Sequence, residues 1–123
     1  MVSILDFISE KLEEAEIPYE FGEWTQPVSY PYFVGSFDET DFRYEDNCTA
    51  GTFTLDGWAR GGGAQLALAE VSDTVKKVFA NLQEVRDNRS FFVRFGGSQP
   101  VPSGEEGLYK VTITLFTSEW EGE

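Results

Sequence analysis

The stretch "FTLDGWARGGGAQLALAEV", residues 53–71, runs from an alternating strand pattern through three glycines into an amphipathic helix pattern. Phe53 and Leu55 alternate with polar residues, as in a strand that buries one face. The glycines at 61–63 let the backbone turn from strand to helix without steric cost. The stretch therefore predicts a helix that packs against a sheet, with Trp58 and Arg60 at the turn between them.

The same two periodicities extend over the rest of the chain. Helical spacing covers residues 3–16 and 61–85, strand patterns cover 19–24, 32–42, 49–59, 91–97 and 108–120, and loops are expected at 25–31 and 98–107. The order is therefore α-β-β-β-α-β-β, and short connections favour a mainly antiparallel sheet with both helices packed on one face. A length of 123 residues fits one domain. We expect a single α+β domain over residues 1–123.

The chain is strongly acidic, with a net charge of −13. Residues 1–60 contribute −10 and residues 61–123 contribute −3, so one surface is expected to be strongly negative. This balance argues against ordinary binding to a phosphate backbone, which needs clustered Lys and Arg. No stretch approaches the ~20 apolar residues of a membrane-spanning helix, so we expect a soluble protein with no membrane partner.

The residue types give no support for a catalytic, cofactor or metal site. The chain has no histidine, the usual general base and the commonest transition-metal ligand, and its only cysteine is Cys48. The segment "ARGGGAQL" lacks both the lysine followed by Ser or Thr of a P-loop and the G-x-G-x-x-G of a dinucleotide loop. We therefore predict no enzymatic activity and no cofactor.

Acidic residues are concentrated in "DETDFRYEDN", residues 38–47, which is expected to form a charged hairpin tip or a longer loop. Five carboxylates lie there: Asp38, Glu39, Asp41, Glu45 and Asp46. Their spacing does not match the alternating ligands and final Glu of an EF-hand loop. A solvated loop is therefore favoured over a cation site.

Aromatic residues in polar surroundings are the candidates for a subunit interface. Trp58 falls on the polar face of its strand, where it either meets a partner or packs under the second helix. Arg60 follows it at the same end. Phe42 and Tyr44 lie inside the acidic segment, where they fit a long hairpin arm that becomes ordered on a partner. These four residues are our predicted interface.

Four segments together carry a resemblance to a known family over nearly the full length of the chain. They are the first helix "ILDFISEKLEEA", the strand start "YPYFVGSF", the strand, turn and helix "TFTLDGWARGGGAQLALAEVSDTVKKVF", and the last strand "LYKVTITLF". The chain resembles the small tail-terminator and tail-completion proteins of long-tailed bacteriophages, including minor tail proteins of prophages.

The resemblance implies a structural protein, one subunit of a closed homo-oligomeric ring, commonly a hexamer. Such a ring caps the tail tube and joins it to the head–tail connector. The implied partners are further copies of the chain, the tail tube protein and the connector protein, and DNA passes through the hole without specific binding. The implied location is the virion tail, after assembly in the cytoplasm of the host bacterium. There the five acids of the segment 38–47 would line the lumen, where they repel DNA, or clasp a neighbouring subunit.

Two other function classes remain open from the residues. An acidic DNA mimic would present carboxylates in place of phosphates to a DNA-binding protein, and a charge of −13 suits that role. It predicts acids arrayed along an exposed helix or sheet face, whereas the second helix carries both signs and the strands are Thr-rich. A small domain that binds an apolar ligand would account for eleven Phe residues, and it requires a cavity.

Overall fold

The computed structural model describes residues 2–43 and 48–121 and confirms the α+β class. Two helices and six strands make up the fold: α1 (Val2–Glu14), β1 (Tyr19–Phe21), β2 (Tyr32–Arg43), β3 (Cys48–Arg60), α2 (Ala64–Phe79), β4 (Asn81–Arg86), β5 (Arg89–Val101) and β6 (Leu108–Glu121). The order is thus α-β-β-β-α-β-β-β, with one strand more than predicted. No described helix has the length and apolar character needed to cross a membrane.

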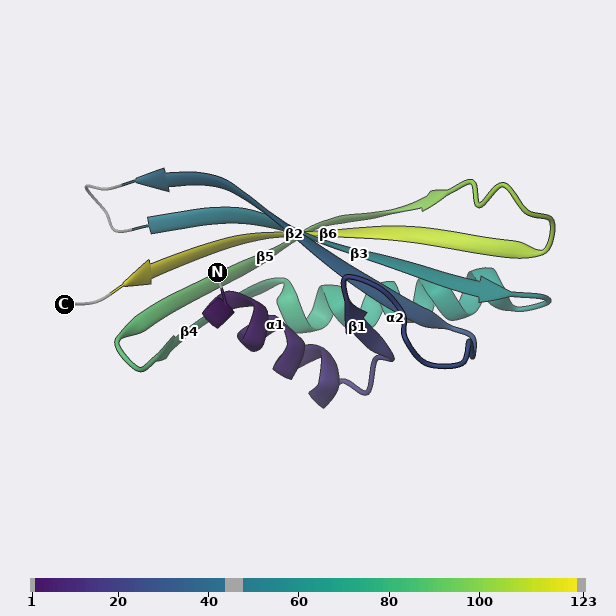
Figure 1. Ribbon diagram of the computed structural model, residues 1–123, viewed down its shortest axis with the longest axis horizontal. Coiled ribbons are helices and arrows are strands. Elements are labelled where there is room, and N and C mark those ends of the chain that lie inside the picture. The colour runs from purple at the N-terminus through teal and green to yellow at the C-terminus, as the bar shows by residue number, and fades with distance from the viewer. Residues whose placement is uncertain (1, 44–47, 122–123) are drawn as a thin grey trace.

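All six strands form one twisted sheet in the order β1-β2-β3-β6-β5-β4. The short β1 pairs with β2 in parallel, and every other pair is antiparallel, as predicted for most of the sheet. Figure 1 shows α1 and α2 on the same side of this sheet. It also shows the β2–β3 hairpin extending beyond both helices on the left of the view. The molecule is therefore a two-layer domain with one helical layer and one bare sheet face.

The prediction of one helix over residues 61–85 is wrong at its end, because α2 stops at Phe79 and residues Asn81–Arg86 form β4. Two residues, Asp87 and Asn88, both with positive φ (47° and 70°), join β4 to β5. A two-residue loop of this kind is the favoured connection of an antiparallel hairpin. Pairing of Leu82 with Val93 across that hairpin thus overrides the helical spacing of the segment.

The ends of two other predicted segments also differ from those in the structure. The strand predicted at 19–24 is only the three-residue β1, because Gly22 adopts a left-handed φ of 88° and ends it. The loop predicted at 98–107 begins later, because β5 pairs with β6 as far as Val101. A bulge between Phe95 and Gly97 shifts the register within this strand and keeps it paired.

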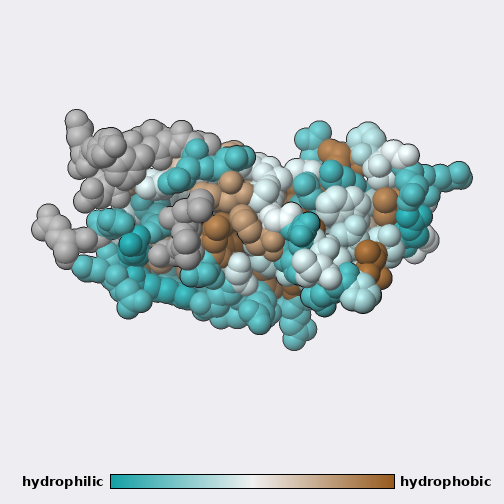
Figure 2. All heavy atoms as spheres, in the orientation of Figure 1, coloured by the Kyte–Doolittle hydropathy of each residue, from teal (hydrophilic) through white to brown (hydrophobic). Residues whose placement is uncertain are grey.

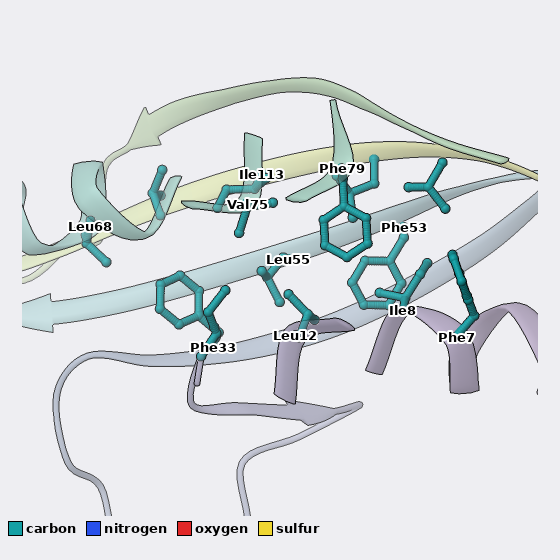
Figure 3. Close-up of a cluster of buried hydrophobic side chains, with 14 of the residues drawn as sticks. Phe7, Ile8, Leu12, Phe33, Phe53, Leu55, Leu68, Val75, Phe79 and Ile113 are labelled. Carbon is teal, nitrogen blue, oxygen red and sulfur yellow. The ribbon is translucent and has the colours of Figure 1, made fainter. Parts of the chain in front are cut away.

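The core lies between the helical layer and the inner face of the sheet. In Figure 3, Phe7, Ile8 and Leu12 project from α1, and Leu68, Val75 and Phe79 project from α2, toward the side chains of the sheet. Phe33, Phe53, Leu55 and Ile113 meet them from β2, β3 and β6, and all four are fully buried. The alternation read from residues 53–59 thus places the inner face as predicted.

A charged bridge fastens α1 to the edge strand β4. The Arg86 guanidinium donates two hydrogen bonds to the Glu10 carboxylate, at 2.6 Å and 2.9 Å, and also pairs with Glu84. It lies 5.1 Å from the centre of the Phe7 ring. The hydrogen bonds from Arg86 lower the pKa of Glu10 below its ordinary value of 4.5. The ionised form of Glu10 therefore favours the folded state.

We expect Arg86→Met to lower the melting temperature at pH 7, and the difference from wild type to shrink at acid pH. Because the pKa of Glu10 is lowered in the folded state, ionised Glu10 stabilises the fold above pH 4.5. This stabilisation is lost as the pH falls through the lowered pKa. Thermal unfolding followed by circular dichroism between pH 7 and pH 3 measures this. Arg94→Met is the control, because Arg94 stacks on Phe116 and forms no ion pair with a described residue. A difference that is the same at every pH would contradict the bridge.

Candidate functional site

Four aromatic residues cluster on the sheet face opposite the helices, which we call the outer face. Tyr32 stacks on Trp58 with ring centroids 5.1 Å apart and an interplanar angle of 18°. Trp24 and Tyr30 flank Tyr32, at 5.1 Å and 5.7 Å between centroids. We call Trp24, Tyr30, Tyr32 and Trp58 the aromatic cluster. Its aromatic side chains are in contact with one another at one end of the β2–β3 pair.

Register and loop geometry build this cluster. Tyr32 and Trp58 are directly paired residues of β2 and β3, so their side chains leave the sheet on the same side and stand next to each other. The segment between β1 and β2 folds back to add Trp24 and Tyr30. The Trp24 indole nitrogen is shielded from water and has no hydrogen-bond partner among the described residues. Desolvation raises the pKa of the Tyr32 hydroxyl above its ordinary value of 10.

Two cations border the aromatic cluster. The Lys110 ammonium lies 5.2 Å from the centre of the Trp58 ring, and the Arg60 guanidinium lies 5.7 Å from that of Tyr30. Arg60 also pairs with Glu105 in the loop between β5 and β6. Aromatic residues and Arg are enriched at protein interfaces, and a cation over an aromatic ring is attracted to it. This end of the outer face is therefore a candidate docking surface.

The structure excludes one of the two places considered for Trp58. Its neighbours Gly57 and Ala59 are buried on the inner face, whereas Trp58 is half-buried on the outer one. Packing under α2 is therefore wrong. The sequence did not predict four residues of this surface: Trp24, Tyr30, Tyr32 and Lys110. The tripeptide "YPY", residues 30–32, contains two of these aromatic residues, but their contact with Trp58 depends on the β2–β3 register, which a single strand does not reveal.

The predicted acidic residues and the aromatic cluster do not form one patch. Asp38 and Glu39 are exposed on β2 near its far end, and Asp41 and Phe42 continue that strand opposite Ala50 and Thr49. Thr49 and Trp58 are about nine residues apart on β3, or roughly 30 Å at the rise of an extended strand. The remaining predicted residues, Tyr44, Glu45 and Asp46, lie outside the described residues. The predicted residues thus fall at two separate ends of the β2–β3 hairpin. Trp58 and Arg60 lie at the end with the aromatic cluster, which we call the aromatic end, and the acidic residues lie toward the other, which we call the acidic end.

A polar pair on the outer face links β3 to β6. Asp56 accepts a hydrogen bond from the Thr112 hydroxyl at 2.7 Å, across the β3–β6 pair. Within residues 2–43 and 48–121, no group of three or more Cys, Asp or Glu side chains is placed to hold a metal ion.

Comparison with known proteins bears on the fold. No protein-family model and no curated protein matches the sequence. Seventeen chains of solved structures are similar to the fold. One of them superposes with a TM-score of 0.76 over 98% of this chain and 95% of its own length, at 14% sequence identity. This likeness establishes that the two-layer α+β fold, over its full length, is one that an experimentally determined protein also adopts.

Proposed function

We propose that this chain is a subunit of a sixfold homo-oligomeric ring that terminates the tail tube of a long-tailed bacteriophage and joins it to the head connector. The proposal starts from the sequence resemblance to tail-terminator and tail-completion proteins. It is supported by the outer face, which no helix covers and which carries a stacked Trp–Tyr pair, since apolar clusters at a surface mark candidate interaction sites.

The separation of the aromatic end from the acidic end is the observation that carries the proposal. A closed ring needs a heterologous contact, in which one patch meets a different patch on the next copy. The sheet offers two such patches, with Arg60 of β3 and Lys110 of β6 beside the aromatic cluster and Asp38 and Glu39 farther along β2. Opposite charges at the two ends favour head-to-tail contact over self-pairing.

The acidic surface fits a ring through which DNA moves. Figure 2 shows hydrophilic residues along much of the visible edge of the molecule, and apolar residues both near the middle of the view and at several places on its right. A net charge of −13 repels phosphates, so DNA that passes through the hole does not bind to the wall. The acids of the segment 38–47 are the ones that we assign to the lumen or to the clasp on a neighbouring subunit.

Light scattering over a concentration series, alone and with purified tail tubes, tests the ring directly. We expect a species of six times 13.8 kDa, with a central hole in negative-stain images, at high concentration or on the tube ends. Tube ends that stay bare, together with a monomer at every concentration, would overturn the proposal. A monomer that instead binds a DNA-binding protein would identify the acidic mimic.

Trp58→Ala is expected to raise the concentration needed for ring formation about tenfold to thirtyfold. Truncation of a large aromatic residue at the centre of an interface commonly costs about 2 kcal/mol, which corresponds to that ratio. Analytical ultracentrifugation measures the midpoint of assembly. Leu66→Ser is the matched control, because Leu66 is 64% exposed on α2 and far from the outer face. Equal effects of the two substitutions would remove the aromatic cluster from the interface.

A further inference from the structure

A second feature, unrelated to the outer face, is a groove of about 660 Å³ between α2 and the end of the β5–β6 pair. Its apolar lining comes from Leu68 and Ala69 of α2, Pro100 of β5, and Leu108 and Val111 of β6. This volume lies within the range of small-molecule sites, about 300–1,000 Å³. The groove lies on the helical side of the sheet, because Val111 belongs to the buried inner face.

Ser72 is the one buried polar side chain in the lining of this groove. It is 7% exposed, and its hydroxyl has no hydrogen-bond partner among the described residues. The nearby Thr74 hydroxyl, by contrast, donates to the backbone carbonyl of Glu70. A buried hydroxyl without a partner destabilises the folded protein. Because rotation about χ1 moves a serine hydroxyl among three staggered positions, a ligand in the groove can supply the missing partner.

The edge of β5 beside the groove disfavours a peptide strand as the occupant. β4 pairs only with residues 89–94, so the rest of β5 has β6 on one side and no described strand on the other. Pro100 on that stretch, and Pro102 just after it, have no backbone N–H to donate to an added strand. Proline on a strand edge is a common protection against strand addition. A small molecule fits this site better than an extended chain.

Charges at the groove restrict the class of ligand. Asp73 and Glu105 belong to its lining, where Glu105 is paired with Arg60, and the whole chain carries −13. The only cation in the lining is Lys110, whose ammonium lies over Trp58 on the outer face. An anionic ligand such as a fatty acid would therefore be repelled. The groove favours a neutral molecule with an apolar body and one hydrogen-bonding group.

We propose that the groove between α2 and the β5–β6 pair binds a neutral apolar small molecule, which forms one hydrogen bond with Ser72. The apolar walls supply the affinity and the serine orients the ligand. The groove and the aromatic cluster lie on opposite sides of the sheet and share Lys110 at their border, and probe binding and ring assembly are measured separately, so either can fail without the other.

N-phenyl-1-naphthylamine is a suitable probe, because it is neutral and apolar, carries a single N–H, and becomes strongly fluorescent in an apolar site. We expect saturable binding at one site per chain, and much weaker binding of an anionic naphthalene sulfonate probe. Absence of saturable binding by the neutral probe would overturn the proposal.

Two substitutions by tryptophan on α2 test where the probe binds. Ala69→Trp fills the groove from its exposed rim and should reduce probe affinity at least tenfold. Glu70→Trp is the matched control, because Glu70 is exposed and does not line the groove, and it should leave the affinity unchanged. Thermal unfolding checks that both variants fold. Undiminished binding by folded Ala69→Trp, or loss of binding in Trp58→Ala, would place the probe elsewhere and overturn the proposal.

Ser72→Ala tests the hydrogen bond separately from the shape of the groove. It should weaken probe binding about threefold to tenfold, the ratio that corresponds to one hydrogen bond. It should also raise the melting temperature of the unliganded protein, because an unpartnered buried hydroxyl is removed. Unchanged affinity would show that Ser72 has no part in the site.

Discussion

Phe53→Ala is expected to lower the free energy of unfolding by about 3–5 kcal/mol, the range for loss of a large aromatic side chain from a core. Phe53 is completely buried at the middle of β3. Its ring meets Tyr19 and Phe21 of β1, with centroids 6.0 Å and 6.4 Å away, and the side chains of α1 approach it in Figure 3. The substitution opens a cavity where both helices and three strands converge. The loss is large, because the total free energy of unfolding of a domain is only about 5–15 kcal/mol.

Urea unfolding followed by circular dichroism measures this loss as a shift of the midpoint at unchanged slope. Phe116→Ala is the matched control. Phe116 lies on β6 directly opposite Thr52, the neighbour of Phe53, but it is on the outer face and 40% exposed. Its removal should cost about 1 kcal/mol or less, because surface positions contribute little packing. Similar losses for the two Phe residues would mean that the two faces of the sheet are assigned wrongly.

Gly57→Ala is expected to destabilise the protein by about 1–3 kcal/mol, although alanine is ordinarily the better residue in a strand. Gly57 is paired with Phe33 across the β2–β3 ladder, and the Phe33 ring lies over the glycine, where a Cβ atom would overlap it. Phe33 is itself completely buried, so its ring has no free space to move into. The absence of a side chain at residue 57 is thus part of the core packing.

Gly62→Ala supplies the comparison for this effect. A Cβ atom at Gly62 would have no atom within 4 Å, and the residue is not among those with positive φ. That substitution should be neutral or stabilising by up to about 1 kcal/mol, through the lower entropy of the unfolded chain. Calorimetry of the two variants side by side separates overpacking from any general effect of glycine replacement. A neutral Gly57→Ala would show that Phe33 can repack.

Most of the fold was predictable because its long elements follow a single period. The alternation through β3 and β6 and the helical spacing of α1 and the first part of α2 each extend over many residues, so local errors do not change the result. The strand β4 was missed because Leu82 and Val85 also satisfy helical spacing after Phe79. Asp87 and Asn88 were the available signal, since residues of this type favour the left-handed turn of a tight hairpin.

The aromatic cluster was predictable only in part. Strand alternation placed Trp58 opposite Phe53 and Leu55, which is where the structure has it. The β2–β3 register brings Tyr32 onto Trp58. The fold of the preceding loop then brings Trp24 and Tyr30 to them. Neither property belongs to a single segment, because a shift of one residue in the register would move Tyr32 to the other face.

The sequence by itself determined the class of this protein: an acidic α+β domain whose strands have one apolar face and whose helices each have one apolar stripe. These features arise from periodicities that local backbone geometry dictates. Only the tertiary structure decided which side chains share a surface. Strand pairing separated the aromatic end of the β2–β3 hairpin from its acidic end, and the packing of α2 against β5 and β6 left the groove beside Ser72. Those outcomes depend on contacts between residues far apart in the chain, whose geometry is set when the layers pack together.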